Sequence, residues 1–202
     1  PNPISLPNYE VESFFQPSAY LSGDWYDYWK LNEYEVLFYL ADVSGHGVTS
    51  SLLTSWMAAF HGRSKTPRQL IQKLNAMLVQ ENIEKHITMV AGILNLQTHE
   101  ITWSSAGHYP PPIIFEPNQA PQILTTSSFP LGLTEDLDVE EHICKLNPDA
   151  RFILCSDGAL EPFDGGLNDQ FNQLVDHLQN NSFQAPEHVA DDIAILSICR
   201  MN

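Results

Sequence analysis

The connections between successive apolar segments are the strongest constraint on how this 202-residue chain can fold. Between residues 87 and 125 four strand-like runs follow one another closely, namely ITMVAGILNL, EITWSSAG, PPIIFE and PQILT. Their connections contain Gly, Pro and Asn and have hairpin lengths, whereas neighbouring parallel strands need a crossover of about a dozen or more residues. The runs ICKL and RFILCS continue the pattern. We therefore predict a long antiparallel meander.

Helical periodicity precedes and follows this meander. Residues 36–43 (VLFYLADV) are mostly apolar, as in a strand buried on both faces, and residues 50–61 show helical spacing of apolar side chains. A second helix is predicted to begin after Thr66 as N-cap, with Pro67 in its first turn. A third is predicted over residues 169–179, and the run DIAILSICR is predicted to form the last strand. This order indicates an α+β fold with helices packed on sheets.

Composition excludes several classes of function. The formal net charge of −16 disfavours nucleic acid or an anionic membrane as a partner, because both would be repelled. We find no apolar run near the roughly 20 residues that a membrane-spanning helix needs, so we predict no membrane insertion. The cysteines Cys144, Cys155 and Cys199 are widely spaced and form no CxxC pair. Neither a disulfide framework nor a zinc knuckle is expected, and a reducing, cytoplasmic location is the prediction.

The first eight residues, PNPISLPN, contain three prolines and carry no signal-peptide pattern. Proline-rich segments are stiff and extended, as linkers often are. We predict that residues 1–8 end a linker from an upstream sensory or receiver domain and that residues 9–202 form one catalytic domain.

Aspartates recur at the ends of apolar strands, beside glycines. Asp24 follows Gly23, Asp42 ends VLFYLA, Asp157 follows RFILCS, and Asp191 opens DDIAILS. Each Asp–Gly pair alone is typical of an ordinary turn. Four carboxylates brought together would repel one another strongly, so they would need cations. Oxygen ligands without His or Cys favour Mg²⁺ or Mn²⁺ over zinc.

Six ordered motifs carry a resemblance to a known family. GDWYD, LADVSGHGV, AGHYPPPI, FPLGL, ILCSDGALE and ADDIAIL resemble those of bacterial PPM/PP2C-type phosphatases of the SpoIIE/RsbU group. The resemblance extends from about Gly23 to Arg200. It implies a four-layer α/β/β/α sandwich with mainly antiparallel sheets and two divalent cations, Mn²⁺ or Mg²⁺, bound at one end.

The resemblance also implies roles for individual residues. Asp42 would bridge both cations and the Val43 carbonyl would support one of them, while Asp24, Asp157 and Asp191 would complete the ligand set. Asp27 and Asp192 match family positions too, but we expect them to support the ligands. Two cations about 3.5–4 Å apart acidify a shared water and clamp phosphoryl oxygens for in-line attack. The implied substrate is phosphoserine or phosphothreonine on a regulatory protein such as an anti-sigma-factor antagonist.

Four further residues in these motifs are candidates for a chemical role. His46 and His108 are candidates for protonating the leaving group, and His46 is our expected catalytic residue beside Asp42, although histidine in a Gly-flanked turn can simply cap backbone. Ser44 more reasonably tightens its turn, because no Ser-His-Asp pattern or GxSxG motif is evident. Glu161 lies where the family often has an acidic residue, and we assign it no cation.

Two alternative functions stay open from the sequence. A phosphatase-like output domain of an RssB-like response regulator binds a sigma factor or its regulator without catalysis, but such an adaptor would not need all four aspartates. A hydrolase of small phosphate esters would use the same cations. Only 33 residues separate Asp157 from Asp191, with room for about one helix, and basic residues are scarce. The oligomeric state, including a homodimer, is not specified.

Overall fold

The strands form two five-stranded antiparallel sheets in a computed structural model that describes residues 1–202 except 2, 21, 46 and 82. The first sheet has the order β2-β3-β4-β5-β8, and the second has the order β1-β10-β9-β6-β7. The first comprises β2 (Asp24–Lys30), β3 (Glu35–Val43), β4 (Ile87–Asn95), β5 (Glu100–Ala106) and β8 (His142–Lys145). The second comprises β1 (Tyr9–Gln16), β10 (Ile193–Arg200), β9 (Arg151–Cys155), β6 (Ile113–Phe115) and β7 (Gln122–Ile123).

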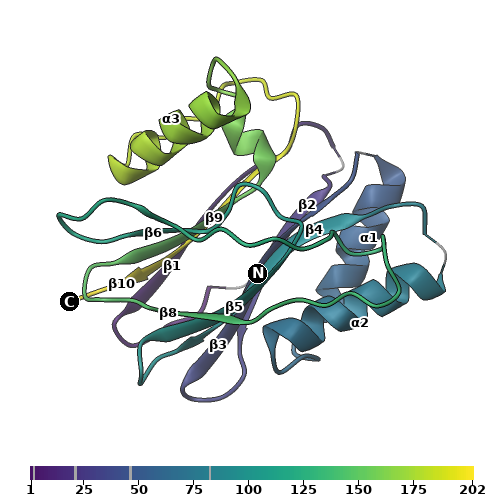
Figure 1. Cartoon of the computed structure of the whole chain (residues 1–202), viewed down its shortest axis with the longest axis horizontal. Helices are drawn as coiled ribbons and strands as arrows, with labels where there is room; N and C mark the ends of the chain where they lie inside the picture. Colours follow the sequence, from purple (N-terminus) through teal and green to yellow (C-terminus); the bar gives the residue numbers. More distant parts are fainter. Residues whose placement is uncertain (2, 21, 46, 82) are drawn as a thin grey trace.

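Helices cover the outer face of each sheet (Figure 1). Helices α1 (Val48–Ala58) and α2 (Pro67–Gln80) lie on the first sheet, and α3 (Leu167–Gln179) lies on the second. A short 3₁₀ helix, η1 (Asp157–Leu160), follows β9 directly. The two sheets pack face to face between these helices, which confirms the predicted α+β class and the four-layer α/β/β/α sandwich. The single helix α3 also fits the short segment between Asp157 and Asp191.

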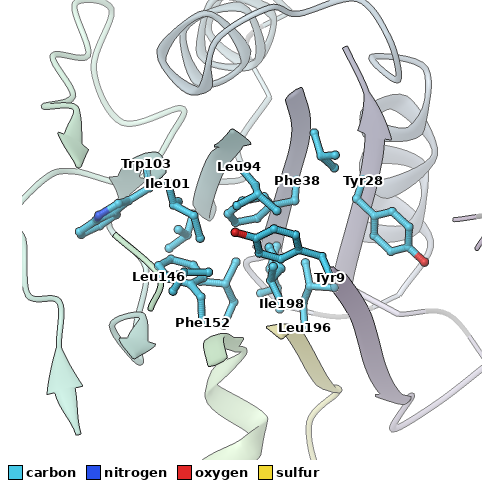
Figure 2. Close-up of a cluster of buried hydrophobic side chains, with 14 of the residues drawn as sticks. Tyr9, Tyr28, Phe38, Leu94, Ile101, Trp103, Leu146, Phe152, Leu196 and Ile198 are labelled. Atoms are coloured by element: carbon cyan, nitrogen blue, oxygen red, sulfur yellow. The ribbon is translucent and has the colours of Figure 1, made fainter. Parts of the chain in front are cut away.

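A hydrophobic core fills the space between the sheets (Figure 2). Phe38 of β3 and Phe152 of β9 are fully buried and meet edge to face with ring centroids 5.7 Å apart. Trp103 of β5 and Leu196 of β10 extend this layer. Burying one such side chain stabilises the fold by about 1.5–3 kcal/mol. The core thus holds both sheets, and the loops at their ends, in a fixed relation.

The helix predictions agree with the structure in outline. Thr66 caps α2 as predicted, because its hydroxyl accepts a hydrogen bond of 3.1 Å from the Gln69 amide. The apolar side chains predicted to line one face of α1 include Leu52, Leu53, Trp56 and Met57. Leu53 and Met57 are buried, but Leu52 is 57% exposed and Trp56 is 41% exposed, so this face is narrower than predicted. The main sheet contacts of α1 are with β2 and β3, so only a narrow stripe of its side chains is buried.

Strand β1 was not predicted from the sequence. It is the edge strand of the second sheet and pairs only with β10, so most of its side chains are exposed and no clean alternation marks it. Leu6, within the segment expected to be a linker, is buried at 8% exposure in the core between the sheets. In the part of the chain that the structure describes, none of the helices has the length and apolar character to cross a bilayer.

Candidate metal centre

The sheet topology brings the four predicted aspartates to one end of the sandwich. Asp24 begins β2 and lies directly opposite Asp42 near the end of β3. Asp157 follows the end of β9, and Asp191 precedes the start of β10, which pairs antiparallel with β9. Both pairs therefore occupy the end of the sandwich that lies between α3 and the start of α1 (Figure 1).

Burial and mutual repulsion oppose ionisation of these carboxyl groups. Asp24 is only 3% exposed, and burial, followed by the charge of Asp42, raises its pKa to about 9. Burial, followed by the charges of Asp157 and Asp191, raises the pKa of Asp42 to about 7. Asp157 is exposed as a whole residue, but partial loss of solvent around its carboxyl group, followed by the charge of Asp191, also raises the pKa of Asp157. The aspartates of the two sheets are therefore close enough to repel one another, and positive charge among them would be stabilising.

Two glycines let the backbone segments of this end approach closely. A Cβ atom on Gly23 would lie 2.9 Å from the Val43 carbonyl oxygen, and one on Gly158 would lie 2.1 Å from the Asp192 carbonyl oxygen. We expected these glycines to permit sharp turns, but neither has a positive φ. Both positions need glycine because there is no room for a side chain. A Cβ atom at either position would push the aspartate-bearing segments apart.

Asp192 fixes the segment that leads into Asp24. Its carboxylate accepts hydrogen bonds from the amide and hydroxyl of Ser18 at 2.7 and 2.9 Å, from the Ser22 hydroxyl at 2.8 Å and from the Gly23 amide at 2.7 Å. Although burial opposes its ionisation, these hydrogen bonds keep the pKa of Asp192 below its usual value. The Asp192 carboxylate thus accepts four hydrogen bonds and links the start of β10 to the segment before β2.

Hydrogen bonds hold the backbone of Val43 and Ser44, the two residues after Asp42. The Val43 amide donates to the Gly23 carbonyl at 3.1 Å, and the Ser44 amide donates to the His86 carbonyl at 2.9 Å. The Lys85 ammonium donates to the Ser44 carbonyl at 2.6 Å, and the Ser44 hydroxyl accepts from the His86 amide at 3.1 Å. Ser44 therefore tightens the turn as expected. Lys85, which the sequence did not single out, places a cation beside this loop.

The two candidate histidines differ in what the structure says of them. His46 lies outside the described residues, so its predicted catalytic role stays a prediction. His108 is 8% exposed, and burial lowers its pKa to about 4. Its Nε2 is 2.9 Å from the Cys155 carbonyl oxygen, and its Nδ1 is 3.3 Å from the Thr88 hydroxyl. A buried ring with both nitrogens engaged is unsuited to proton transfer.

Burial of His108 predicts a specific pH dependence of stability. Its folded pKa of about 4 lies below the ordinary value of about 6.5, so below pH 6.5 the unfolded chain binds a proton that the native state does not. Its stabilising contribution is complete above about pH 6.5 and is lost as the pH falls toward 4. We expect the difference in free energy of unfolding between wild type and His108→Gln to shrink by about 2 kcal/mol from pH 7 to pH 5. Denaturant titrations in chelator measure it, and a constant difference would contradict a buried neutral histidine.

Two further acidic residues of the motifs are engaged in structural contacts. The Asp27 carboxylate lies 2.7 Å from His61 Nδ1 and also accepts from the Tyr28 amide at 2.8 Å. The Glu161 carboxylate accepts from the Ala190 amide at 2.9 Å and so tethers the residue before Asp191. Asp27 and Glu161 are thus held by contacts within the protein, and the supporting role expected of Asp27 stays a prediction.

The donor set fits hard divalent cations in its chemistry. Asp24 Oδ2 is buried and has no hydrogen-bond partner among the described residues, which is costly for a carboxylate oxygen unless a cation approaches it. The neighbouring donors are also oxygens, which suit Mg²⁺ and Mn²⁺. In the described residues, no three His, Cys, Asp or Glu side chains are already grouped closely enough to hold an ion. Among these residues the carboxylates therefore lie near one another without converging on one ion position.

Comparison with known proteins identifies the family. Residues 32–200 match the family model described as "Stage II sporulation protein E (SpoIIE)", which covers most of the chain. The chain belongs to the SpoIIE family. All the candidate site residues except Asp24 and Asp27 lie within the matched range, and those two precede it on β2.

Individual relatives agree with this assignment. The chain is 26% identical over 175 residues to the phosphoserine phosphatase RsbP of Bacillus subtilis, an alignment that covers 79% of this chain but 42% of RsbP. The RsbU and RsbW domains of Rv1364c from Mycobacterium tuberculosis superpose with a TM-score of 0.80 at 19% identity, covering 96% of this chain and 60% of that one. RsbX in complex with magnesium gives 0.71 at 14% identity, with 97% of each chain covered. These structures establish the shared PP2C-like fold.

Proposed function

We propose that this domain is a metal-dependent protein serine/threonine phosphatase with a centre for two divalent cations. The observation that carries the proposal is the meeting of four aspartates at one end of the sandwich, where Asp24 is buried with an unpartnered oxygen and Asp42 has a raised pKa. Membership of the SpoIIE family and similarity to a phosphoserine phosphatase support it.

Asp42 is the proposed bridging ligand. It lies opposite Asp24 in the first sheet, and the charges of Asp157 and Asp191 in the second sheet raise its pKa. Its charge is therefore coupled to carboxylates in both halves of the site. Asp24, Asp157, Asp191 and the Val43 carbonyl are the proposed remaining ligands. The chemistry that two bound cations supply is acidification of a shared water and neutralisation of phosphoryl oxygens during in-line displacement.

The chain's own residues define how open the site is. Asp157 and Asp191 are exposed to solvent, whereas Asp24 is buried. The proposed ligands therefore range from a buried position to one that a substrate can reach from solvent. Exposure of Asp157 and Asp191 suits a phosphorylated side chain on the surface of another protein. We propose phosphoserine or phosphothreonine on a cytoplasmic regulatory protein, of the anti-sigma-factor antagonist type, as the substrate class. The bound magnesium of RsbX makes Mg²⁺ a candidate beside Mn²⁺.

An upstream sensory or receiver domain is proposed as the regulator, since the chain spans less than half the length of RsbP. The alternative function is a non-catalytic adaptor that binds a sigma factor or its regulator. The exposed Leu52 and Trp56 on α1 would suit such binding. However, an adaptor would gain nothing from burying the repelling carboxyl group of Asp24, so catalysis accounts for more of the structure.

Hydrolysis of two substrates separates these functions. An aryl phosphate and a phosphoserine protein are each incubated with the domain and Mn²⁺, with and without chelator. We expect hydrolysis that requires the metal, and faster turnover of the phosphoprotein. Equal or better turnover of the aryl phosphate would favour a small-ester hydrolase. A folded domain without turnover on either substrate would overturn the phosphatase proposal in favour of the adaptor.

A further inference from the structure

His108 connects the two sheets immediately behind the candidate metal centre. Resting on the proposed function, we infer that His108 is a positioning residue that sets the separation between the Asp42 side and the Asp157 side of the centre. Its ring reaches β4 of the first sheet through Thr88 and β9 of the second sheet through Cys155. Each contact lies close along the backbone to a proposed ligand.

On the first sheet the contact leads to Asp42. Thr88 is the cross-strand partner of Asp42 in the antiparallel pair of β3 and β4. The Thr88 hydroxyl lies 3.3 Å from His108 Nδ1. Cross-strand partners move together because the ladder hydrogen bonds fix their spacing. Holding Thr88 therefore holds the strand position that carries the proposed bridging ligand.

On the second sheet the contact leads to Asp157. The Cys155 carbonyl, 2.9 Å from His108 Nε2, belongs to the last residue of β9, two residues before Asp157. Cys155 also pairs with Ile195 of β10, close to the segment that carries Asp191. A carbonyl oxygen only accepts hydrogen bonds, so Nε2 carries the proton, and Nδ1 of the neutral ring accepts from the Thr88 hydroxyl. One buried ring thereby ties both ligand-bearing strands without adding charge.

The backbone of His108 is itself held by the FPLGL loop. Gly107 has φ of +61°, and a Cβ atom there would lie 2.5 Å from Pro130. The Gly107 amide donates to the Ser128 hydroxyl at 3.0 Å, and this hydroxyl donates to the Ser105 carbonyl at 2.6 Å. Contacts between the motifs AGHYPPPI and FPLGL therefore fix the backbone position from which the His108 ring extends.

Metal affinity of ring variants tests the inference. Mn²⁺ is titrated calorimetrically into wild type, His108→Leu, His108→Gln and Thr88→Val. Loss of a residue that orients metal ligands typically weakens binding about 10–100-fold. We expect that range for His108→Leu and a smaller loss for His108→Gln, which can still donate to the Cys155 carbonyl. Thr88→Val, which keeps the side-chain shape, should weaken binding in wild type but change little further in the His108→Leu background.

The control is Leu146→Ala, a change in the same core between the sheets but beside His99, which precedes β5, whereas His108 follows the other end of β5. If Leu146→Ala weakens Mn²⁺ binding as much as His108→Leu does, His108 has only a general stabilising role and the inference is wrong. Unchanged affinity in both His108→Gln and Thr88→Val would also contradict it while leaving the proposed function intact. Absence of binding in wild type would instead overturn the proposed function and this inference with it.

Discussion

Asp42→Asn is expected to lower the metal-dependent hydrolysis rate by about a thousandfold or more, the largest effect of any single substitution. Asp42 faces Asp24 across the β2–β3 pair and is coupled by charge to Asp157 and Asp191, so its loss affects both proposed cation positions. Steady-state rates at saturating Mn²⁺ measure the effect. The matched control is Asp176→Asn on the exposed face of α3, which should keep full activity. Full activity of Asp42→Asn would contradict the bridging assignment.

The same variant should not be destabilised when cations are absent. Burial and the neighbouring aspartates raise the pKa of Asp42 to about 7, so the ionised carboxylate is unfavourable in the metal-free native state at pH 8. Asparagine has nearly the same shape and carries no charge. We therefore expect metal-free Asp42→Asn to unfold at the same temperature as wild type or a higher one at pH 8. Thermal unfolding in chelator measures this, and a marked decrease would mean that Asp42 has a structural role as well.

Asp192→Ala is expected to destabilise the domain by about 4 kcal/mol. The substitution removes an acceptor of four hydrogen bonds from Ser18, Ser22 and Gly23, and it leaves the buried Gly23 amide and the partly buried serine donors without this partner. Hydrogen bonds to charged groups contribute about 1.5–3 kcal/mol each and are not additive. Denaturant unfolding measures the loss, with the exposed Asp138→Ala as control. A loss below about 1 kcal/mol would show that water replaces these contacts.

Activity should decrease in Asp192→Ala as well, even under conditions where the variant is folded. The Gly23 amide, which Asp192 holds, immediately precedes Asp24, and the Gly23 carbonyl accepts from the Val43 amide. We expect weaker Mn²⁺ binding, because two proposed ligand positions lose their common support. Unchanged affinity in the folded variant would confine Asp192 to stability.

Local signals in the sequence sufficed for much of the fold. The β4–β5 and β6–β7 hairpins were predictable from their short connections, and α2 because Thr66 and Pro67 mark its start. The prediction of one continuous meander was wrong, because the chain passes to the second sheet after β5 and β8 returns to pair with β5. Strand β1 was not predictable, since an exposed edge strand lacks clean alternation. The number of α1 side chains that are buried depends on how much of the sheet the helix covers. A local sequence pattern does not contain this information.

The candidate site shows a similar division. The aspartates were recognisable because each stands at the end of an apolar strand-like run, and Asp24 and Asp157 also adjoin a glycine. Asp192 was expected to support the ligands, but its partners could not be predicted because they are distant in the sequence: Asp192 holds Ser18 and Gly23 from 174 and 169 residues away. Lys85 likewise reaches Ser44 across 41 residues. The need for glycine at position 158 also became clear only from the structure, because the Asp192 carbonyl lies too close to this residue for a side chain to fit.

Anomalous scattering from crystals soaked in Mn²⁺ tests the central claim most directly. The account predicts two anomalous peaks at the end of the sandwich where β3 and β9 finish, with Asp42 contacting both and Asp24, Asp157 and Asp191 among the other ligands. Soaked crystals of Asp42→Asn should lose at least one peak. No peak at this end, or peaks held by other residues while the four aspartates stay apart, would contradict a two-cation centre.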